Sequence, residues 1–326
     1  MDPLDPHLLR PTPTLTGPQV ASQAGVSDEY ADRIFRAIGL PDVPDEAVEF
    51  DERDVKVLSA LRSILDQGYS EEDVLEVART YGQALSRVAH TEVRVFRKNF
   101  IDPLVQQGLD QETLMARLQE VVPTLLELLE QQITLVHRRH LILAMQQATM
   151  LDASGDNETM AVGFVDLVGF SRLAQDLEGE DLGGLISRFE TMALEECVDR
   201  GVHVVKMIGD AVMFVGADVS AVVAAGLAVV EAAERDEDFP AARAGIDLGG
   251  SVTFGGDYFG PPVNIAARLT SFARAGTVVV TAAVIGVLPE GADVSRIGKI
   301  RLKGVGEVRA FKVNALSSAK ATTGIG

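Results

Sequence analysis

The sequence predicts an α+β protein in which an all-α N-terminal domain precedes a domain that mixes strands with helices. The chain has 326 residues, which is enough for about two domains of ordinary size. Apolar residues before residue 150 follow helical spacing, and no convincing strand occurs among them. After residue 158 glycines become frequent, and β-rich runs alternate with helical runs. We therefore place the domain boundary between these two positions.

The N-terminal part begins with an irregular segment and continues as helices. Residues 1–14 contain four prolines and no periodicity, which predicts a flexible arm. Amphipathic runs at 16–24 and 27–38, joined by a glycine, predict a helix-turn-helix in which Ser27 caps the second helix. Further helices are predicted, in order, over residues 52–67, 70–85, 87–99, 111–122 (ended by Pro123) and 124–150. A helical domain is thus expected over residues 15–150, and its long last helix leads into a linker.

The C-terminal part is separated from these helices by a small, polar stretch. Residues 151–158 have linker composition, and the domain that follows is expected to span residues 159–316. Strands are predicted over 160–165, 202–208 and 211–215, and helices over 182–198 and 219–234. The polar residues from 317 to 326 predict a disordered tail.

Composition excludes several classes of protein. The formal net charge of −19 repels polyphosphate backbones and anionic lipid surfaces, so nucleic acid is a disfavoured partner. The single cysteine, Cys197, excludes an internal disulfide and a multi-cysteine zinc site, and it fits a reducing cytoplasm. The N-terminus does not have the pattern of a secretory signal. The longest apolar runs, at 121–150 and 219–233, are interrupted by charges or too short, so no membrane span is expected.

Two carboxylates stand where predicted strands end. Asp166 ends an apolar run and precedes a turn at Gly169, Phe170 and Ser171, whose amides could hold a phosphate beside a metal ion. Asp210 follows Gly209 between two apolar runs, which indicates a hairpin with a carboxylate at its tip. Taken singly, Asp166 is explained equally well as a helix cap, and an ordinary turn is the likelier explanation of Asp210. Together they could hold two divalent cations about 4 Å apart, as in phosphoryl transfer.

A third segment supports nucleotide chemistry. Residues 255–269 contain a glycine-rich turn, two prolines at a helix start, and then Asn264 and Arg268 on one helical face. Asn264 is suited to hydrogen-bond a sugar, and Arg268 is a forked donor for charge that accumulates on a phosphate. Such a pair alone is common on exposed helices.

With these motifs in order, residues 160–313 resemble the catalytic domain of the class III nucleotidyl cyclases. The resemblance implies a ferredoxin-like fold with a mixed sheet flanked by helices, and two bound divalent cations, Mg²⁺ or Mn²⁺. It also implies residue roles: metal binding by Asp166 and Asp210, purine selection by Lys206 and Asp257, ribose orientation by Asn264, transition-state stabilisation by Arg268, and further substrate contacts from Lys303 and Phe170.

The purine-selecting pair favours ATP over GTP. Adenine presents an acceptor at N1 and a donor at its amino group, and Lys206 and Asp257 supply the matching donor and acceptor. The expected product is cyclic AMP. The resemblance further implies a homodimer in which each site takes its metal ligands from one protomer and its Asn–Arg pair from the other. A diguanylate cyclase, suggested by Gly255, Gly256 and Asp257, fits the residues that follow less well.

The first 150 residues allow more than one interpretation. The helix-turn-helix resembles the opening of MerR-type DNA-binding domains, but residues 15–80 carry six basic and fifteen acidic side chains, which opposes DNA binding. A DNA-binding or signalling regulator with a non-catalytic, nucleotide-sensing domain is therefore the second choice. A regulatory or dimerisation module, resembling those ahead of actinobacterial cyclase domains, is preferred. His137 and His140 are either pH-sensing groups or, as we favour, solvated side chains beside arginines.

Overall fold

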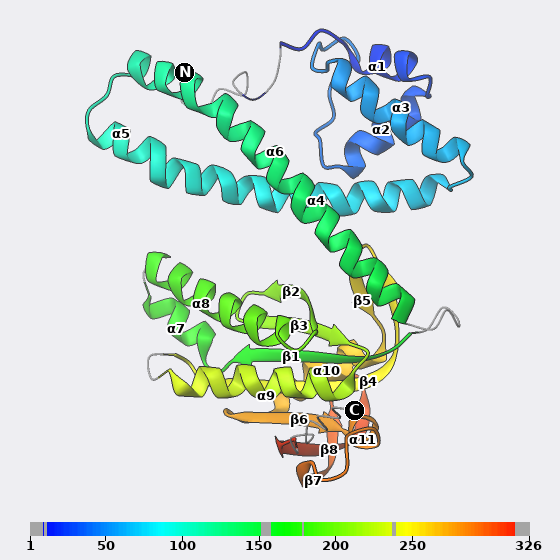
Figure 1. The fold of residues 1–326 in the computed structure, drawn as a ribbon, viewed down its shortest axis with the longest axis vertical. Coiled ribbons are helices and arrows are strands. Elements are labelled where there is room, and N and C mark those ends of the chain that lie inside the picture. Colours follow the sequence, from blue (N-terminus) through cyan, green and yellow to red (C-terminus); the bar gives the residue numbers. More distant parts are fainter. Residues whose placement is uncertain (1–8, 10–11, 151–157, 178, 237–238, 317–326) are drawn as a thin grey trace, which may run out of the picture. The chain divides into compact units, whose positions relative to one another are not determined.

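The computed structural model describes residue 9 and residues 12–150, 158–177, 179–236 and 239–316. Figure 1 shows the chain coloured from blue at its N-terminus to red at its C-terminus. The chain divides into two compact units, Met1–Gln147 and Ala148–Gly326. The predicted tail, most of the predicted arm and most of the predicted linker lie outside the described residues.

The first unit opens with the predicted pair of short helices, α1 (Gly17–Ala24) and α2 (Asp28–Ala37). The side chain of Thr16 accepts a hydrogen bond from the Gln19 amide, and Ser27 likewise caps α2 through the Tyr30 amide. Gly25 adopts the left-handed conformation that ends α1. Helix α3 (Glu52–Asp66) follows after the Asp51 cap. The start of the unit is therefore the helix pair that the sequence predicted.

Two predictions about the later helices were wrong. The runs at 70–85 and 87–99 form one helix, α4 (Glu71–Phe96), which continues through a π-helical turn, η2 (Arg97–Ile101), into α5 (Asp102–Gln106). No glycine or proline separates the two runs, so nothing ends the helix between them. Pro123 does not end a helix either, because α6 spans Gln111–Met150 with Pro123 inside it. Both Pro123 and Gln119, whose carbonyl loses its donor, are exposed, so water can satisfy that carbonyl.

The described residues of the first unit form two small apolar cores. One joins α1, α2, α3 and the start of α4 and includes Val20, Ile34 and Leu58. The other joins the end of α4, η2, α5 and α6 around Ile101 and Leu118. The stretch of α4 between these cores and the stretch of α6 after the second core expose many of their apolar side chains: Tyr81, Leu85, Val88, Leu128, Leu135 and Ile142.

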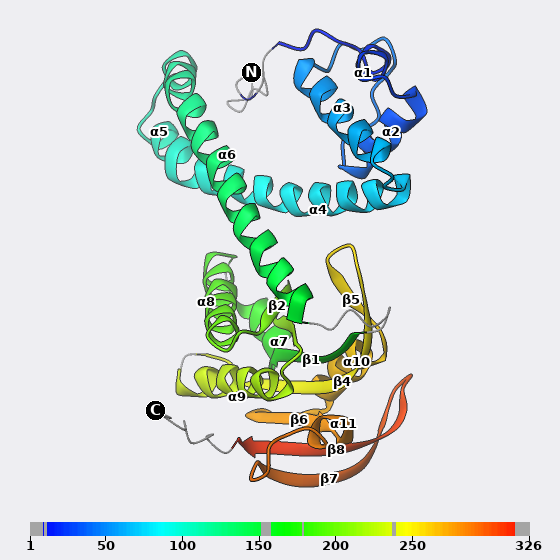
Figure 2. The same ribbon diagram turned by 45° about the vertical axis from the view of Figure 1, so that its right-hand side comes forward.

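The second unit is built on a mixed, mostly antiparallel sheet, which is seen from another side in Figure 2. The strands run in the order β2-β3-β1-β4-β6-β8-β7, and β5 pairs with β4 outside this path. Only β4 and β6 are parallel among these pairings. The bounds are β1 Glu158–Leu167, β2 His203–Ile208, β3 Ala211–Gly216, β4 Ala242–Phe254, β5 Asp257–Phe259, β6 Thr277–Thr281, β7 Asp293–Leu302 and β8 Gly306–Ala315.

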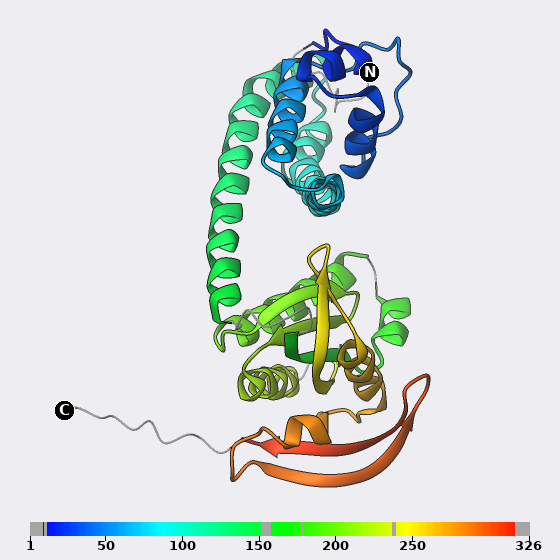
Figure 3. The same ribbon diagram turned by 90° about the vertical axis from the view of Figure 1, so that its right-hand side faces the viewer.

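Helices cover the sheet on both faces, as Figure 3 shows for α9 and α10. The main core packs α8 and α9 against one face through Phe189, Phe214 and Val229. On the other face α10 packs through Ala266 against one apolar cluster and through Leu269 against a second. The predicted α+β architecture is confirmed. The helices are α7 Phe170–Asp176, α8 Gly179–Val198, α9 Val219–Arg235, α10 Pro261–Phe272 and α11 Ala282–Ile285.

Candidate active site

The two candidate metal ligands lie at the same end of the sheet. Asp166 is the last residue but one of β1, and its register partner on β3 is Ala211, the residue after Asp210. Asp210 lies in the tight turn between β2 and β3, where Gly209 has a φ of 63°. The backbone amide of Leu167 donates to the carbonyl oxygen of Asp210 at 3.1 Å. The strand pairing thus brings together two carboxylates that are 44 residues apart in the sequence.

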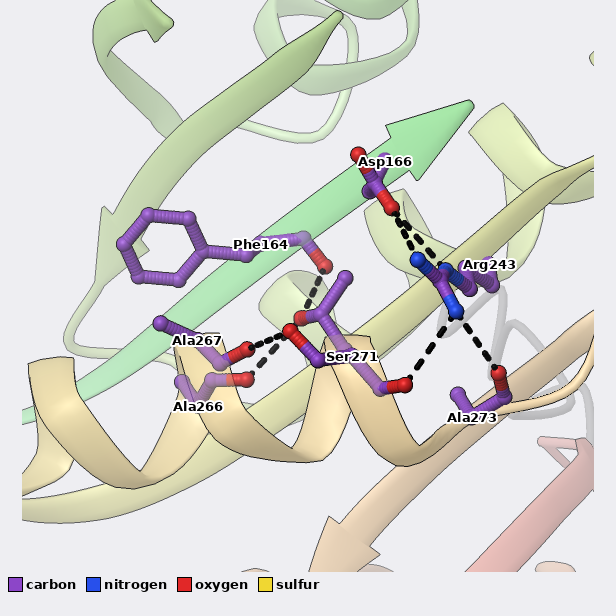
Figure 4. Close-up of polar contacts among 8 residues, drawn as sticks. Phe164, Asp166, Arg243, Ala266, Ala267, Ser271 and Ala273 are labelled. Atoms are coloured by element: carbon purple, nitrogen blue, oxygen red, sulfur yellow. Dashed lines mark hydrogen bonds and ion pairs between the residues drawn. The ribbon is translucent and has the colours of Figure 1, made fainter. Parts of the chain in front are cut away.

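A third residue, Arg243 at the start of β4, completes this end of the site (Figure 4). Its Nε and Nη2 atoms donate to Oδ2 of Asp166 at 2.9 and 2.6 Å. Its Nη1 atom donates to the carbonyl of Ser271 at 3.2 Å. Sequence reasoning missed Arg243. The available signal was a basic residue within the mostly apolar run that begins β4.

The electrostatics of this end favour a cation. Burial raises the pKa of Asp210, and the nearby charge of Asp166 raises it further, while Arg243 opposes the shift. Aspartate oxygens are the hard ligands that Mg²⁺ and Mn²⁺ accept. Among the described residues no three His, Cys, Asp or Glu side chains gather to hold a metal ion by themselves. A cation held by the two aspartates would therefore complete its shell with water, backbone or phosphate oxygens.

The candidate base-selecting residues contact each other. Lys206 on β2 and Asp257 at the start of β5 form an ion pair, and each side chain is about one-third exposed. The second oxygen of Asp257 accepts the backbone amide of Tyr258 at 2.8 Å. The structure thus joins residues that are 51 positions apart in the sequence. A donor and an acceptor stand side by side at this position.

Helix α10 presents the Asn–Arg pair outward. The helix starts after Gly260, which has a φ of 145°, and its buried face includes Ala266 and Leu269. Asn264 and Arg268 lie on the exposed face, one turn apart. Asn264 donates weakly to the carbonyl of Gly260 at 3.4 Å. Within the described ranges nothing forms a hydrogen bond or ion pair with the Arg268 guanidinium, which leaves it available to an anion.

The remaining two candidates lie in different surroundings. Lys303 is exposed in the tight turn between β7 and β8. Phe170 is the first residue of α7, but its side chain is 8% exposed and belongs to the main core. The side chain of Phe170 is therefore buried away from a substrate, and the contact predicted for this residue would have to come from its backbone.

Two protein-family profiles match the chain. A profile described as the adenylate cyclase regulatory domain matches residues 12–142. A profile described as the adenylate and guanylate cyclase catalytic domain matches residues 153–315. The second match contains every candidate site residue named above.

Relatives of known description match most of the chain. An adenylate cyclase of Streptomyces coelicolor is 36% identical over 270 residues, which cover 81% of this chain and 69% of the relative. A protein of Mycobacterium tuberculosis described as a pH-sensitive adenylate cyclase is 31% identical, over 90% of this chain and 77% of the relative.

Solved structures match the C-terminal half. The adenylyl cyclase CyaB of P. aeruginosa has a TM-score of 0.45 and 23% identity over 50% of this chain and 96% of that one. The guanylyl cyclase Cya2 has a TM-score of 0.47 and 17% identity over 51% of this chain and 97% of that one. No helix among the described residues has the length and hydropathy needed to cross a bilayer.

Proposed function

Since this chain belongs to the class III adenylate cyclases with an N-terminal regulatory domain, and so converts ATP to cyclic AMP, we propose that Asp166 and Asp210 hold the catalytic cations. The observation that supports this is their juxtaposition at neighbouring strand ends, where burial and mutual repulsion favour a bound cation. Bound there, two ions of Mg²⁺ or Mn²⁺ would supply charge that favours loss of the ribose 3′ proton and departure of pyrophosphate. Arg243 fixes the orientation of Asp166.

Recognition of adenine falls to the pair formed by Lys206 and Asp257. Their mutual ion pair shows that a donor and an acceptor reach the same point. The Lys206 ammonium would donate to N1 of adenine, and the Asp257 carboxylate would accept from its amino group. Guanine presents the opposite pattern, so it would leave polar groups of the site unpaired.

The exposed groups of α10 act on the sugar and the phosphates in this proposal. Asn264 would hydrogen-bond the ribose and orient its 3′ oxygen toward the α-phosphate. Arg268 has no competing partner among the described residues and would stabilise charge on the α-phosphate as the bond to pyrophosphate breaks. Lys303 would contact the terminal phosphates.

Class III cyclases are generally dimeric, and we propose a homodimer whose two sites each combine aspartates of one protomer with Asn264 and Arg268 of the other. The apolar side chains that α4 and α6 expose in the first unit suit a surface that a second copy covers. Mixing inactive Asp166→Ala protein with inactive Arg268→Ala protein tests the shared site. Subunit exchange should restore activity, because each mixed dimer has one intact site. Demonstrated exchange without recovery would contradict the shared site.

The activity itself is tested with the purified full-length protein. Incubation with ATP and Mn²⁺ or Mg²⁺ should give cyclic AMP, and GTP in parallel should react much more slowly. Formation of cyclic di-GMP from GTP would instead support a diguanylate cyclase. Nucleotide binding without turnover would support a sensory domain.

Regulation by the first unit is tested separately. Comparing full-length protein with residues 151–326 shows whether the regulatory domain raises or lowers the turnover number. His137 and His140 are both exposed, as the favoured interpretation expects, and the Nε2 atom of His137 also lies 3.0 Å from the Tyr81 hydroxyl of α4. A pH–activity curve that is unchanged after both His137 and His140 are replaced by Gln would remove a pH-sensing role for them.

A further inference from the structure

The face of β4 beneath α10 holds a buried carboxyl group that the proposed mechanism does not use. Gly245, Asp247 and Gly249 share this face because side chains alternate along a strand. A Cβ atom at Gly245 would lie 2.5 Å from the Ala266 carbonyl oxygen, so β4 and α10 touch backbone to backbone there. At Gly249 the contact is with Pro262. Asp247 therefore lies, along β4, between two points at which this strand contacts α10.

Asp247 is surrounded by apolar side chains that pack in the same clusters as residues of α10. Asp247 is 4% exposed. Its register partner on β1 is Val162, which packs in the same cluster as Ala266. On the other side lies β6, whose Val279 packs with Leu269 of α10. Burial raises the pKa of Asp247, and a hydrogen bond from Thr281 opposes that shift.

The Thr281 hydroxyl is used in its hydrogen bond to Asp247 and not in a helix cap. It occupies the N-cap position of α11, where a threonine hydroxyl ordinarily accepts a backbone amide. Here no side-chain cap forms, and the Thr281 hydroxyl instead donates to Oδ1 of Asp247. The pair joins β4 to the end of β6 underneath the helix that carries Asn264 and Arg268.

We propose that Asp247 is a positioning residue whose contact with Thr281 fixes how α10 rests on the sheet, and hence where Asn264 and Arg268 meet the substrate. This proposal depends on the function proposed above. A purely structural pair would contribute to stability alone. A positioning pair must also affect turnover, because misplacement by about 1 Å can lower a rate on the order of 100-fold.

The test replaces both members of the pair in the full-length protein, as Asp247→Val with Thr281→Val. Exchange of a buried polar pair for apolar side chains of similar size is often neutral for stability. We expect a melting temperature within a few degrees of wild type and a kcat about 10- to 100-fold lower. The KM for ATP should change less than about threefold, because Asn264 and Arg268 act mainly in the transition state.

Two companion variants make the result specific. Asp247→Asn keeps an acceptor for the Thr281 hydroxyl and should retain more than half of the wild-type kcat. Cys197→Ala removes a buried side chain from the core on the opposite face, and should lower the melting temperature without changing kcat.

The outcomes separate cleanly. A double variant with wild-type kcat, or an Asp247→Asn variant that loses as much activity as the double variant, would overturn the proposal. Where the double variant fails to fold, Asp247→Asn together with Thr281→Val removes the contact without leaving an unpaired buried carboxyl group, and wild-type kcat there would overturn the proposal equally. Failure of the wild-type protein to form cyclic AMP would instead overturn the proposed function.

Discussion

Two ion pairs in the catalytic unit differ in what holds them. Arg243 grips one oxygen of Asp166 with two N–H groups, and the Ser271 carbonyl fixes the same guanidinium. Lys206 meets Asp257 through a single ammonium group, and both side chains are more exposed than those of the first pair. The first contact leaves Oδ1 of Asp166 free of described partners, whereas both oxygens of Asp257 have partners, Lys206 and the Tyr258 amide. In the proposed mechanism, the metal-binding carboxylate Asp166 is therefore already held in place, whereas Lys206 and Asp257 must separate before they can bind the base.

The largest effect should come from the metal end. Asp210→Ala removes one of two proposed ligands, and we expect kcat to fall on the order of 10³-fold or more, since metal-ion stabilisation is worth several kcal/mol. The measurement is cyclic AMP formation at saturating Mn²⁺. Lys206→Gln, which alters only the base-selecting end, serves as the comparison and should lose far less kcat. Equal losses would break the distinction between the two ends.

A change of specificity should be the next largest effect. Exchanging Lys206 for Glu together with Asp257 for Cys reverses the donor and acceptor that meet the base edge. We expect the ratio of kcat/KM for ATP to that for GTP to fall on the order of 100-fold. An unchanged preference for ATP would show that this pair does not read the base.

Arg243→Lys should have a smaller effect. Lysine keeps the positive charge but cannot repeat the forked contact with Asp166 and the additional contact with Ser271. We expect kcat to fall about tenfold with a weaker apparent affinity for Mn²⁺. Lys299→Arg, a cation exchange on an exposed strand, is the control and should leave both values unchanged.

The smallest effect concerns stability against pH. The raised pKa of Asp210 means that its proton is held more tightly in the folded than in the unfolded protein. The stability that this provides is present below the unfolded pKa and is lost as the pH rises through the folded pKa. Asp210→Asn should therefore raise the melting temperature of metal-free protein by a few degrees at neutral pH, but not in strong acid. No difference at neutral pH would contradict the electrostatic description of the metal end.

The sequence predicted local features better than contacts between distant segments. The Gly209–Asp210 pair correctly predicted the hairpin between β2 and β3, because the conformation of a tight turn depends on residues that are near it in the sequence. Arg243 could not be placed, because its contact with Asp166 spans 77 residues and depends on which strands pair. The contact between Asp247 and Thr281 could not be predicted for the same reason, because it depends on the pairing of β4 with β6. The prediction that Pro123 ends a helix was wrong because the effect of a proline depends on whether water reaches the carbonyl group one turn earlier.

The backbone contact between Gly245 and α10 also restricts how the gene can vary. Even alanine, the smallest possible replacement, would push the helix away from its strand, so few amino-acid changes at this codon are compatible with an active enzyme. Exposed positions such as Lys299 can accept many more amino-acid substitutions by comparison. Among diverging descendants of this protein, residue 245 should be among the last to change.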